Sequence, residues 1–219
     1  MPVDHQHKLL FIHIPKAGGT SIESFFGMTD PIHLAFHRWD LHYEDFLKIH
    51  GHLIDAPKMM FEPQHYPLHI LKRFIPEYSS YFSFSFTRHP YTKFLSEYYW
   101  LNSKRLETIN EFSPDAFHSW CTQFLSSIDS SHKEPQVSYI DSTVRFVGKY
   151  ENFRADFEHL KKKLIEFSPE LNEIDQRVLS HDNNTGLDKS QLLPYLLPES
   201  KQLIYDIYSS DFEAFSYEK

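Results

Sequence analysis

A short apolar run followed by a glycine-rich polar loop constrains the fold of this chain more than any other feature. Residues 9–12 read LLFI, residues 13–21 read HIPKAGGTS, and apolar residues return within 22–26. This order predicts a buried strand, a tight loop and a helix. Adjacent glycines let such a loop curl with its N–H groups pointing inward, and Lys16 adds a mobile positive charge. The loop can therefore bind an anion, although an ordinary strand-to-helix turn with a surface lysine would read similarly.

A second strand, polar turn and helix follow later in the chain. Residues 81–87 (YFSFSFT) alternate large apolar with small polar side chains, which is typical of a strand. The turn that follows begins with Arg88, and residues 91–102 then resume a helical pattern. The carboxyl ends of parallel strands meet at one edge of a sheet, which is where ligands bind in such folds. We therefore expect Arg88 and the loop around Lys16 to converge.

The remaining elements complete an α/β pattern. A third strand is predicted over 143–149 and is followed by a helix to Phe167, while residues 171–179 suit either a strand or a short helix. Further helices are predicted over 43–49, 67–75, 114–125 and 199–215. Alternating strands and helices imply three layers with a mostly parallel central sheet. Without a repeat or a linker, residues 1–219 are expected to form a single domain.

Composition excludes several classes of protein. The formal net charge of −8 argues against a general binder of nucleic acids or anionic membranes. The only cysteine, Cys121, excludes an internal disulfide and a cysteine-based zinc cluster. No stretch reaches the roughly 18 to 20 apolar residues of a membrane span. We expect a cytoplasmic protein without a membrane span, and its oligomeric state is left open.

Together these motifs resemble the sulfotransferases that use 3'-phosphoadenosine 5'-phosphosulfate (PAPS). Residues 14–21 are similar to the family's 5'-phosphosulfate loop, and residues 86–90 with 96–98 are similar to its 3'-phosphate motif. Residues 146–153 and 210–217 are weaker matches. Within the family, the chain looks most like the branch that holds the carbohydrate sulfotransferases and short bacterial members. The resemblance implies a three-layer, P-loop-like sulfotransferase fold.

The resemblance also implies roles for individual residues. Lys16 would neutralise the phosphosulfate and the leaving group, while Arg88 and Ser96 would hold the 3'-phosphate. The remaining residues of the donor loop would bind the 5'-phosphate end: Ala17, Gly18, Gly19, Thr20 and Ser21. The chain would then be an enzyme that transfers a sulfuryl group from PAPS to a hydroxyl acceptor, expected to be a carbohydrate or small metabolite. The products would include 3'-phosphoadenosine 5'-phosphate (PAP), and no metal would be required.

A hydroxyl acceptor needs a general base, for which histidine is the usual choice near neutral pH. By resemblance to the Gln-His pair of bacterial members, His65 is the first candidate. His52 is the second, because His50 and His52 echo a His-x-His of some carbohydrate sulfotransferases. Glu62 and Glu97 are further alternatives.

Two other functions fit parts of the pattern. A P-loop kinase would bind ATP and magnesium, but Lys16 precedes the glycines, whereas the lysine of the kinase signature follows them. A kinase also needs an acidic residue for magnesium, usually at the end of another strand, where this chain has Arg88. A nucleotide-binding protein without turnover would keep the same pocket. The pairs His5 with His7 and His50 with His52 have no clearly placed third ligand, so no metal site is expected.

Overall fold

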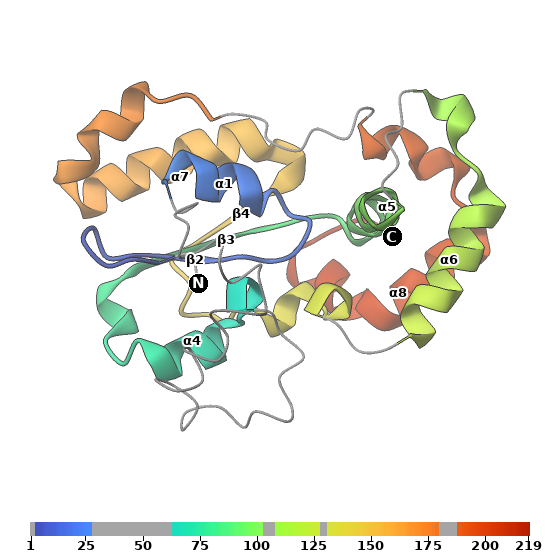
Figure 1. Ribbon diagram of the computed structural model, residues 1–219, viewed down its shortest axis with the longest axis horizontal. Helices are drawn as coiled ribbons and strands as arrows, with labels where there is room; N and C mark the ends of the chain where they lie inside the picture. The colour runs from blue at the N-terminus through green and yellow to red at the C-terminus, as the bar shows by residue number, and fades with distance from the viewer. Residues whose placement is uncertain (1–2, 28–62, 103–107, 128–130, 180–187) are drawn as a thin grey trace.

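A computed structural model describes residues 3–27, 63–102, 108–127, 131–179 and 188–219 of the chain (Figure 1). Its sheet contains four strands, in the spatial order β1-β2-β3-β4. They are β1 (Val3–Asp4), β2 (Leu9–Ile12), β3 (Phe82–Thr87) and β4 (Phe146–Lys149). β2, β3 and β4 are parallel to one another, and β1 pairs antiparallel with β2. The carboxyl ends of β2, β3 and β4 therefore lie along one edge of the sheet.

Helices connect and cover these strands. The α-helices of the described residues are α1 (Gly19–Phe25), α4 (Leu68–Phe74), α5 (Pro90–Leu101), α6 (Pro114–Ser126), α7 (Phe153–Phe167) and α8 (Pro198–Ala214). Short 3-10 helices join them: η4 (Pro63–His65), η5 (Tyr78–Ser80), η6 (Ile109–Glu111), η7 (Ser131–Lys133), η8 (Gln136–Ser138), η9 (Tyr150–Asn152), η10 (Pro169–Gln176) and η11 (Lys189–Tyr195). Ser113 caps α6, because its Oγ accepts a hydrogen bond from the N–H of Ala116.

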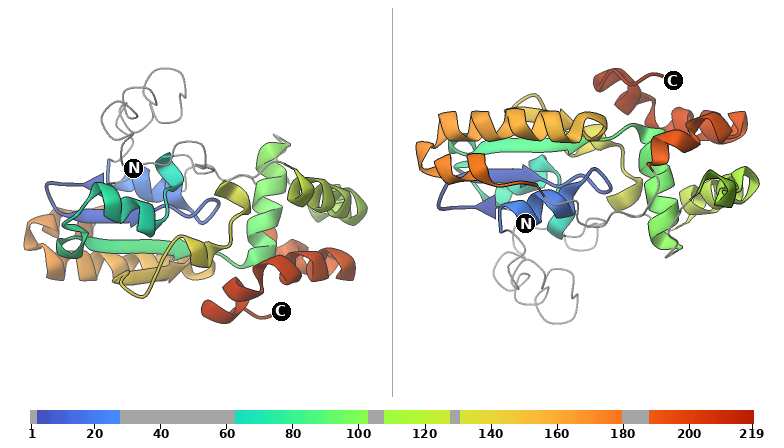
Figure 2. Two further views of the ribbon diagram at one scale, coloured as in Figure 1. Left: turned by 90° about the horizontal axis from the view of Figure 1, so that it is seen from below. Right: turned by 90° about the horizontal axis from the view of Figure 1, so that it is seen from above.

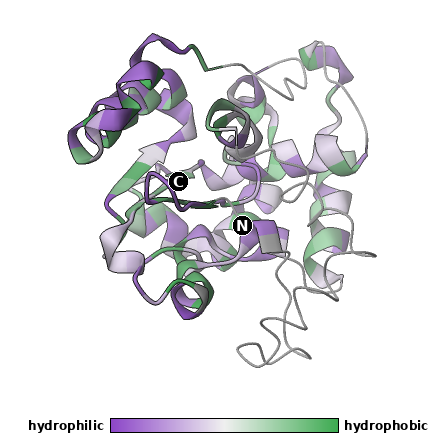
Figure 3. Ribbon diagram, turned by 60° about the vertical axis from the view of Figure 1, so that its left-hand side comes forward, coloured by the Kyte–Doolittle hydropathy of each residue, from purple (hydrophilic) through white to green (hydrophobic). Residues whose placement is uncertain are grey.

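The α-helices form layers on the two faces of the sheet. α1 and α7 lie on one face and α4 on the other (Figure 1), and the views from below and above show the same arrangement (Figure 2). The predicted three-layer α/β architecture with a mostly parallel sheet is therefore confirmed. α5, α6 and α8 gather beyond the end of the sheet. Each long helix carries both hydrophilic and hydrophobic segments, as expected for helices that bury one side (Figure 3).

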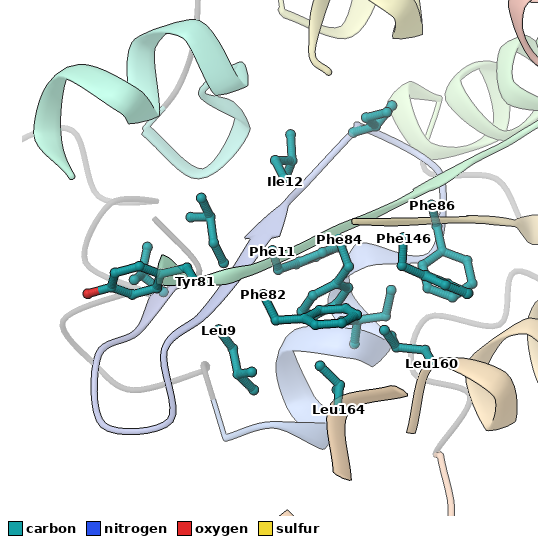
Figure 4. Close-up of a cluster of buried hydrophobic side chains, with 14 of the residues drawn as sticks. Leu9, Phe11, Ile12, Tyr81, Phe82, Phe84, Phe86, Phe146, Leu160 and Leu164 are labelled. Carbon is teal, nitrogen blue, oxygen red and sulfur yellow. The ribbon is translucent and has the colours of Figure 1, made fainter. Parts of the chain in front are cut away.

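The main core lies between the sheet and α7. Phe11, Phe84 and Phe146 point from the strands toward Leu160 and Leu164 of α7 (Figure 4). All residues of β2 and β3 are buried, as expected for parallel strands that are covered on both faces. The small hydroxyl residues of β3 are tolerated there because neighbouring carbonyl groups accept their hydrogen bonds. A second aromatic core joins α5, α6 and α8.

Differences from the expected elements are local. The third strand begins at Phe146 rather than Thr143. Of the two alternatives for residues 171–179, the structure has the short helix, as the 3-10 helix η10. The two-residue strand β1 was not predicted. The helix expected over 43–49 lies outside the described residues. Within the described ranges, no helix combines the length and apolarity needed to span a bilayer.

Candidate functional site

The loop between β2 and α1 has a backbone that requires its glycines. Lys16 has φ 64° and Gly18 has φ 90°, both in the left-handed region. A Cβ on Gly19 would lie 2.0 Å from Nε2 of His13, and one on Gly18 would lie 3.0 Å from the ring of Phe153. A lysine in the left-handed region costs roughly 1 kcal/mol, and such strain is concentrated at functional sites. The conformation of this loop is thus fixed by the packing around it.

The side chain of Lys16 is half-buried, and its ammonium group lies beside an aromatic ring. Its Nζ is 4.5 Å from the ring centroid of Trp100 on α5. Burial lowers the pKa of Lys16 from 10.5 to about 8, although the negative charge of Glu97 acts in the opposite direction. Among the described residues no carboxylate forms an ion pair with Lys16. A partly buried cation without a carboxylate partner is suited to neutralising a bound anion.

Arg88, at the carboxyl end of β3, joins the two loops. One terminal N–H of its guanidinium donates to the carbonyl of Lys16 at 3.1 Å, and Nε donates to Oγ1 of Thr92 at 3.1 Å. The guanidinium also lies 4.1 Å from the ring centroid of Tyr150, and the residue is 5% exposed. Burial lowers the pKa of the guanidinium, since burial disfavours the charged form. The structure therefore brings Arg88 and the Lys16 loop together.

Ser96 lies on the side of α5 that faces these two cations. It follows Thr92 by four residues and precedes Trp100 by four, so the three side chains share one helix face. Thr92 contacts Arg88, and Trp100 contacts Lys16. The hydroxyl of Ser96 is half-buried between these contacts. No described residue hydrogen-bonds to it.

A buried amide and carboxylate fix the backbone of Arg88, and sequence reasoning missed both. Oε1 of Gln136 accepts the Arg88 N–H at 2.8 Å, and its Nε2 donates to the Arg88 carbonyl at 2.7 Å. The carboxylate of Asp211 accepts the backbone N–H groups of Gln136 and Val137 at 2.9 and 3.0 Å. Burial raises the pKa of the Asp211 carboxyl, and these hydrogen bonds oppose the shift. The only sequence signal was the weak match of residues 210–217.

Lys189 is a further cation of this region that sequence reasoning missed. It begins η11, is 4% exposed, and its Nζ lies 5.1 Å from the ring centroid of Tyr99. Burial, followed by the nearby charge of Arg88, lowers the pKa of Lys189 to about 8. The positive charges of Arg88, Lys93 and Lys189 also lower the pKa of Lys16. An acidic chain thus concentrates four cations around one loop.

His65 lies beside the start of the same loop. Its Nδ1 is 3.0 Å from the backbone carbonyl of His13, and the residue is 5% exposed. A carbonyl only accepts, so Nδ1 carries the proton and Nε2 is the basic nitrogen of the neutral ring. The preceding residue, Gln64, donates to Oε2 of Glu23, whose Oε1 lies 2.7 Å from Nδ1 of His13. His52 and Glu62 lie outside the described residues.

The described residues form no group of three or more His, Cys, Asp or Glu side chains that could hold a metal. The two N-terminal histidines have different partners. Nδ1 of His5 lies 2.7 Å from the hydroxyl of Tyr81, and Nδ1 of His7 lies 2.6 Å from Asp4. His50 and His52 lie outside the described residues.

Comparison with known proteins identifies the family. No curated protein and no solved structure matches the chain. A family model described as the sulfotransferase family matches residues 1–218. This match confirms the expected family. Because it covers all but the last of the 219 residues, the chain belongs to the sulfotransferase family.

Proposed function

We propose that this chain transfers a sulfuryl group from PAPS to a hydroxyl group of a carbohydrate acceptor. The family supports sulfuryl transfer in general. The observation that carries the choice of donor is the contact between Arg88 and the carbonyl of Lys16, which places a buried and a half-buried cation on adjoining loops. Among the described residues neither cation is paired with a carboxylate. Two such cations suit a donor with a phosphate at each end of its nucleoside.

In this proposal the donor loop binds the 5'-phosphosulfate and the start of α5 binds the 3'-phosphate. Lys16 and the backbone of residues 17–21 bind the 5' end, together with the hydroxyls of Thr20 and Ser21. Arg88 and Ser96 bind the 3'-phosphate, the group that distinguishes PAPS from ATP. The network of Gln136 supports this role by fixing the Arg88 backbone on both sides.

The reaction forms a bond between the acceptor oxygen and sulfur and breaks the bond between sulfur and the 5'-phosphate oxygen. The electron pair of the broken bond stays on that oxygen, where the charge of Lys16 stabilises it. The hydroxyl proton moves to Nε2 of His65. In this scheme the transfer needs no metal, because Lys16 and the loop N–H groups supply the stabilising charge.

The proposal is tested by incubating the protein with PAPS and a panel of acceptors and measuring PAP by chromatography. The panel contains neutral saccharides, acidic saccharides and simple phenols. Release of PAP that depends on a saccharide supports the proposal. Release of PAP with phenols alone would contradict a carbohydrate acceptor and indicate a phenolic one. Arg145→Ala is the matched control for Arg88→Ala, since Arg145 is exposed at the opposite end of the sheet.

Two outcomes contradict the proposed function. Consumption of ATP with magnesium, without PAP release from PAPS, would favour the kinase alternative. Binding of PAPS without turnover of any acceptor would favour a nucleotide-binding protein that lacks activity.

A further inference from the structure

A second histidine and carboxylate pair lies beside the proposed site. Nδ1 of His132, on η7, lies 2.8 Å from Oε2 of Glu97 on α5, and the two side chains are 11% and 4% exposed. The carboxylate accepts the Nδ1 proton, so Nε2 is the basic nitrogen of the neutral His132 ring. A base oriented by a carboxylate in this way is a recurring arrangement in enzymes that move protons.

The Glu97–His132 pair lies near two residues of the proposed reaction. They are Lys16, which stabilises the charge of the leaving group, and His65, which accepts the hydroxyl proton. The ring of His132 stacks on Trp100 with centroids 5.4 Å apart, and Trp100 in turn lies beneath the ammonium of Lys16. On another side the ring meets His65 edge-on, with centroids 5.1 Å apart. His132 therefore touches both the lysine's aromatic support and the proposed general base.

The charged groups around His132 come from each element packed against it. From α5, Glu97 contacts its ring and Nζ of Lys93 donates to its backbone carbonyl at 2.8 Å. From the donor loop, Lys16 is close enough to Glu97 for the carboxylate to affect its pKa. From η4, the ring of His65 contacts the ring of His132, and the ring of His13 contacts that of His65. Among these groups, Glu97 provides the carboxylate in direct contact with His132.

We propose that His65 and the Glu97–His132 pair form a proton relay, an inference that rests on the proposed sulfuryl transfer. The acceptor hydroxyl gives its proton to Nε2 of His65, which becomes an imidazolium. His65 then passes that proton to Nε2 of His132 and returns to its starting tautomer. The positive charge formed on His132 is balanced by the carboxylate of Glu97, with no other reactant consumed.

The relay is tested with Glu97→Gln and His132→Asn, and with His118→Asn as the control. His118, on α6, is a histidine whose Nδ1 is hydrogen-bonded to Ser200 on α8, outside the proposed site. A glutamine amide at position 97 donates to Nδ1 of His132, which shifts the proton to Nε2 and blocks the relay. We expect kcat to fall by roughly 100-fold, the lower end of general base effects. The Kd for PAP should change little.

The pH profile separates a relay from a structural role. Glu97→Gln removes the carboxylate charge that balances an imidazolium at His132, so it should move the acidic limb of the pH profile of kcat to lower pH, whereas His118→Asn leaves that limb in place. A drop in kcat with an unmoved limb would overturn the relay and leave a structural role for the pair.

Nitrogen-15 NMR of the wild-type histidines provides a test that needs no variant. The relay requires the Nδ1–H tautomer of both His65 and His132 in the neutral state, and the Nε2–H tautomer at His132 would overturn it. A wild-type protein that releases no PAP from PAPS with any acceptor refutes the proposed function and the relay together. An active wild type with normal variants refutes the relay alone.

Discussion

Replacing Lys16 with methionine should stabilise the free protein while removing its function. The lysine side chain is half-buried without a carboxylate partner among the described residues, and desolvation lowers its pKa from 10.5 to about 8. Each pKa unit equals about 1.4 kcal/mol, so this difference corresponds to about 3 kcal/mol against the charged form. Methionine keeps an unbranched stem in the same left-handed backbone conformation and removes the charge.

The net gain is smaller than this, because the contact of the ammonium with Trp100 is lost. That cation–π contact is worth roughly 0.5 to 1 kcal/mol or more. We therefore expect the free energy of unfolding of Lys16→Met at pH 7 to rise by about 2 kcal/mol. For a chain of this length the corresponding increase in Tm is about 4 to 8 °C. PAP should raise the Tm of the wild type and not that of the variant.

The gain should also depend on pH. Between about pH 8 and 10.5 the unfolded chain binds a proton at Lys16 that the folded protein has released, so wild-type stability rises with pH. The advantage of Lys16→Met should therefore shrink over this range. Lys72→Met is the control, because Lys72 is partly exposed and pairs with Asp141 at 2.6 Å. A Tm of Lys16→Met at or below that of the wild type would refute the reasoning. A difference in Tm that does not change with pH would refute it as well.

Two further variants test the packing of the site. In Gly19→Ala the new Cβ would meet the ring of His13 at 2.0 Å, so the ring must shift. We expect the free energy of unfolding from a denaturant titration to fall by about 1 to 3 kcal/mol. An unchanged midpoint would contradict this packing. In Gln136→Leu the backbone N–H and carbonyl of Arg88 lose their buried partners and Asp211 loses a donor. We expect about 2 to 4 kcal/mol less stability and weaker PAP binding, and a stable variant with normal PAP affinity would exclude the network from the site.

The parts of the fold that could be predicted from sequence depend on local patterns. The alternation in β3 and the glycine loop after β2 are contiguous signals, and the convergence of Arg88 with Lys16 follows from the parallel pairing of the strands that precede them. His65 was named from the resemblance of residues 64 and 65 to a family motif, and the structure places it beside the start of the same loop.

Contacts between distant segments could not be predicted in this way. Gln136 and Arg88 are 48 residues apart. No local sequence pattern identifies a side-chain amide that hydrogen-bonds to the backbone of a distant residue. Similarly, a run of three lysines such as residues 161–163 is typical of a solvated helix face. Lys161 is nevertheless 2% exposed, and its Nζ donates to the carbonyls of Asp175 and Arg177. Burial of a charged side chain depends on which carbonyl groups the fold brings to it.

The central claim is that the site recognises a nucleotide with a 3'-phosphate. Calorimetry of PAP binding, set beside ADP with magnesium, tests it most directly for the wild type, Arg88→Ala and the control Arg145→Ala. We expect the wild type and the control to bind PAP and not ADP. Arg88→Ala should lose about 2 kcal/mol or more, roughly 30-fold in Kd, because its guanidinium is buried and hydrogen-bonded. Binding of ADP with magnesium as tight as that of PAP, or undiminished PAP binding by Arg88→Ala, would contradict the claim.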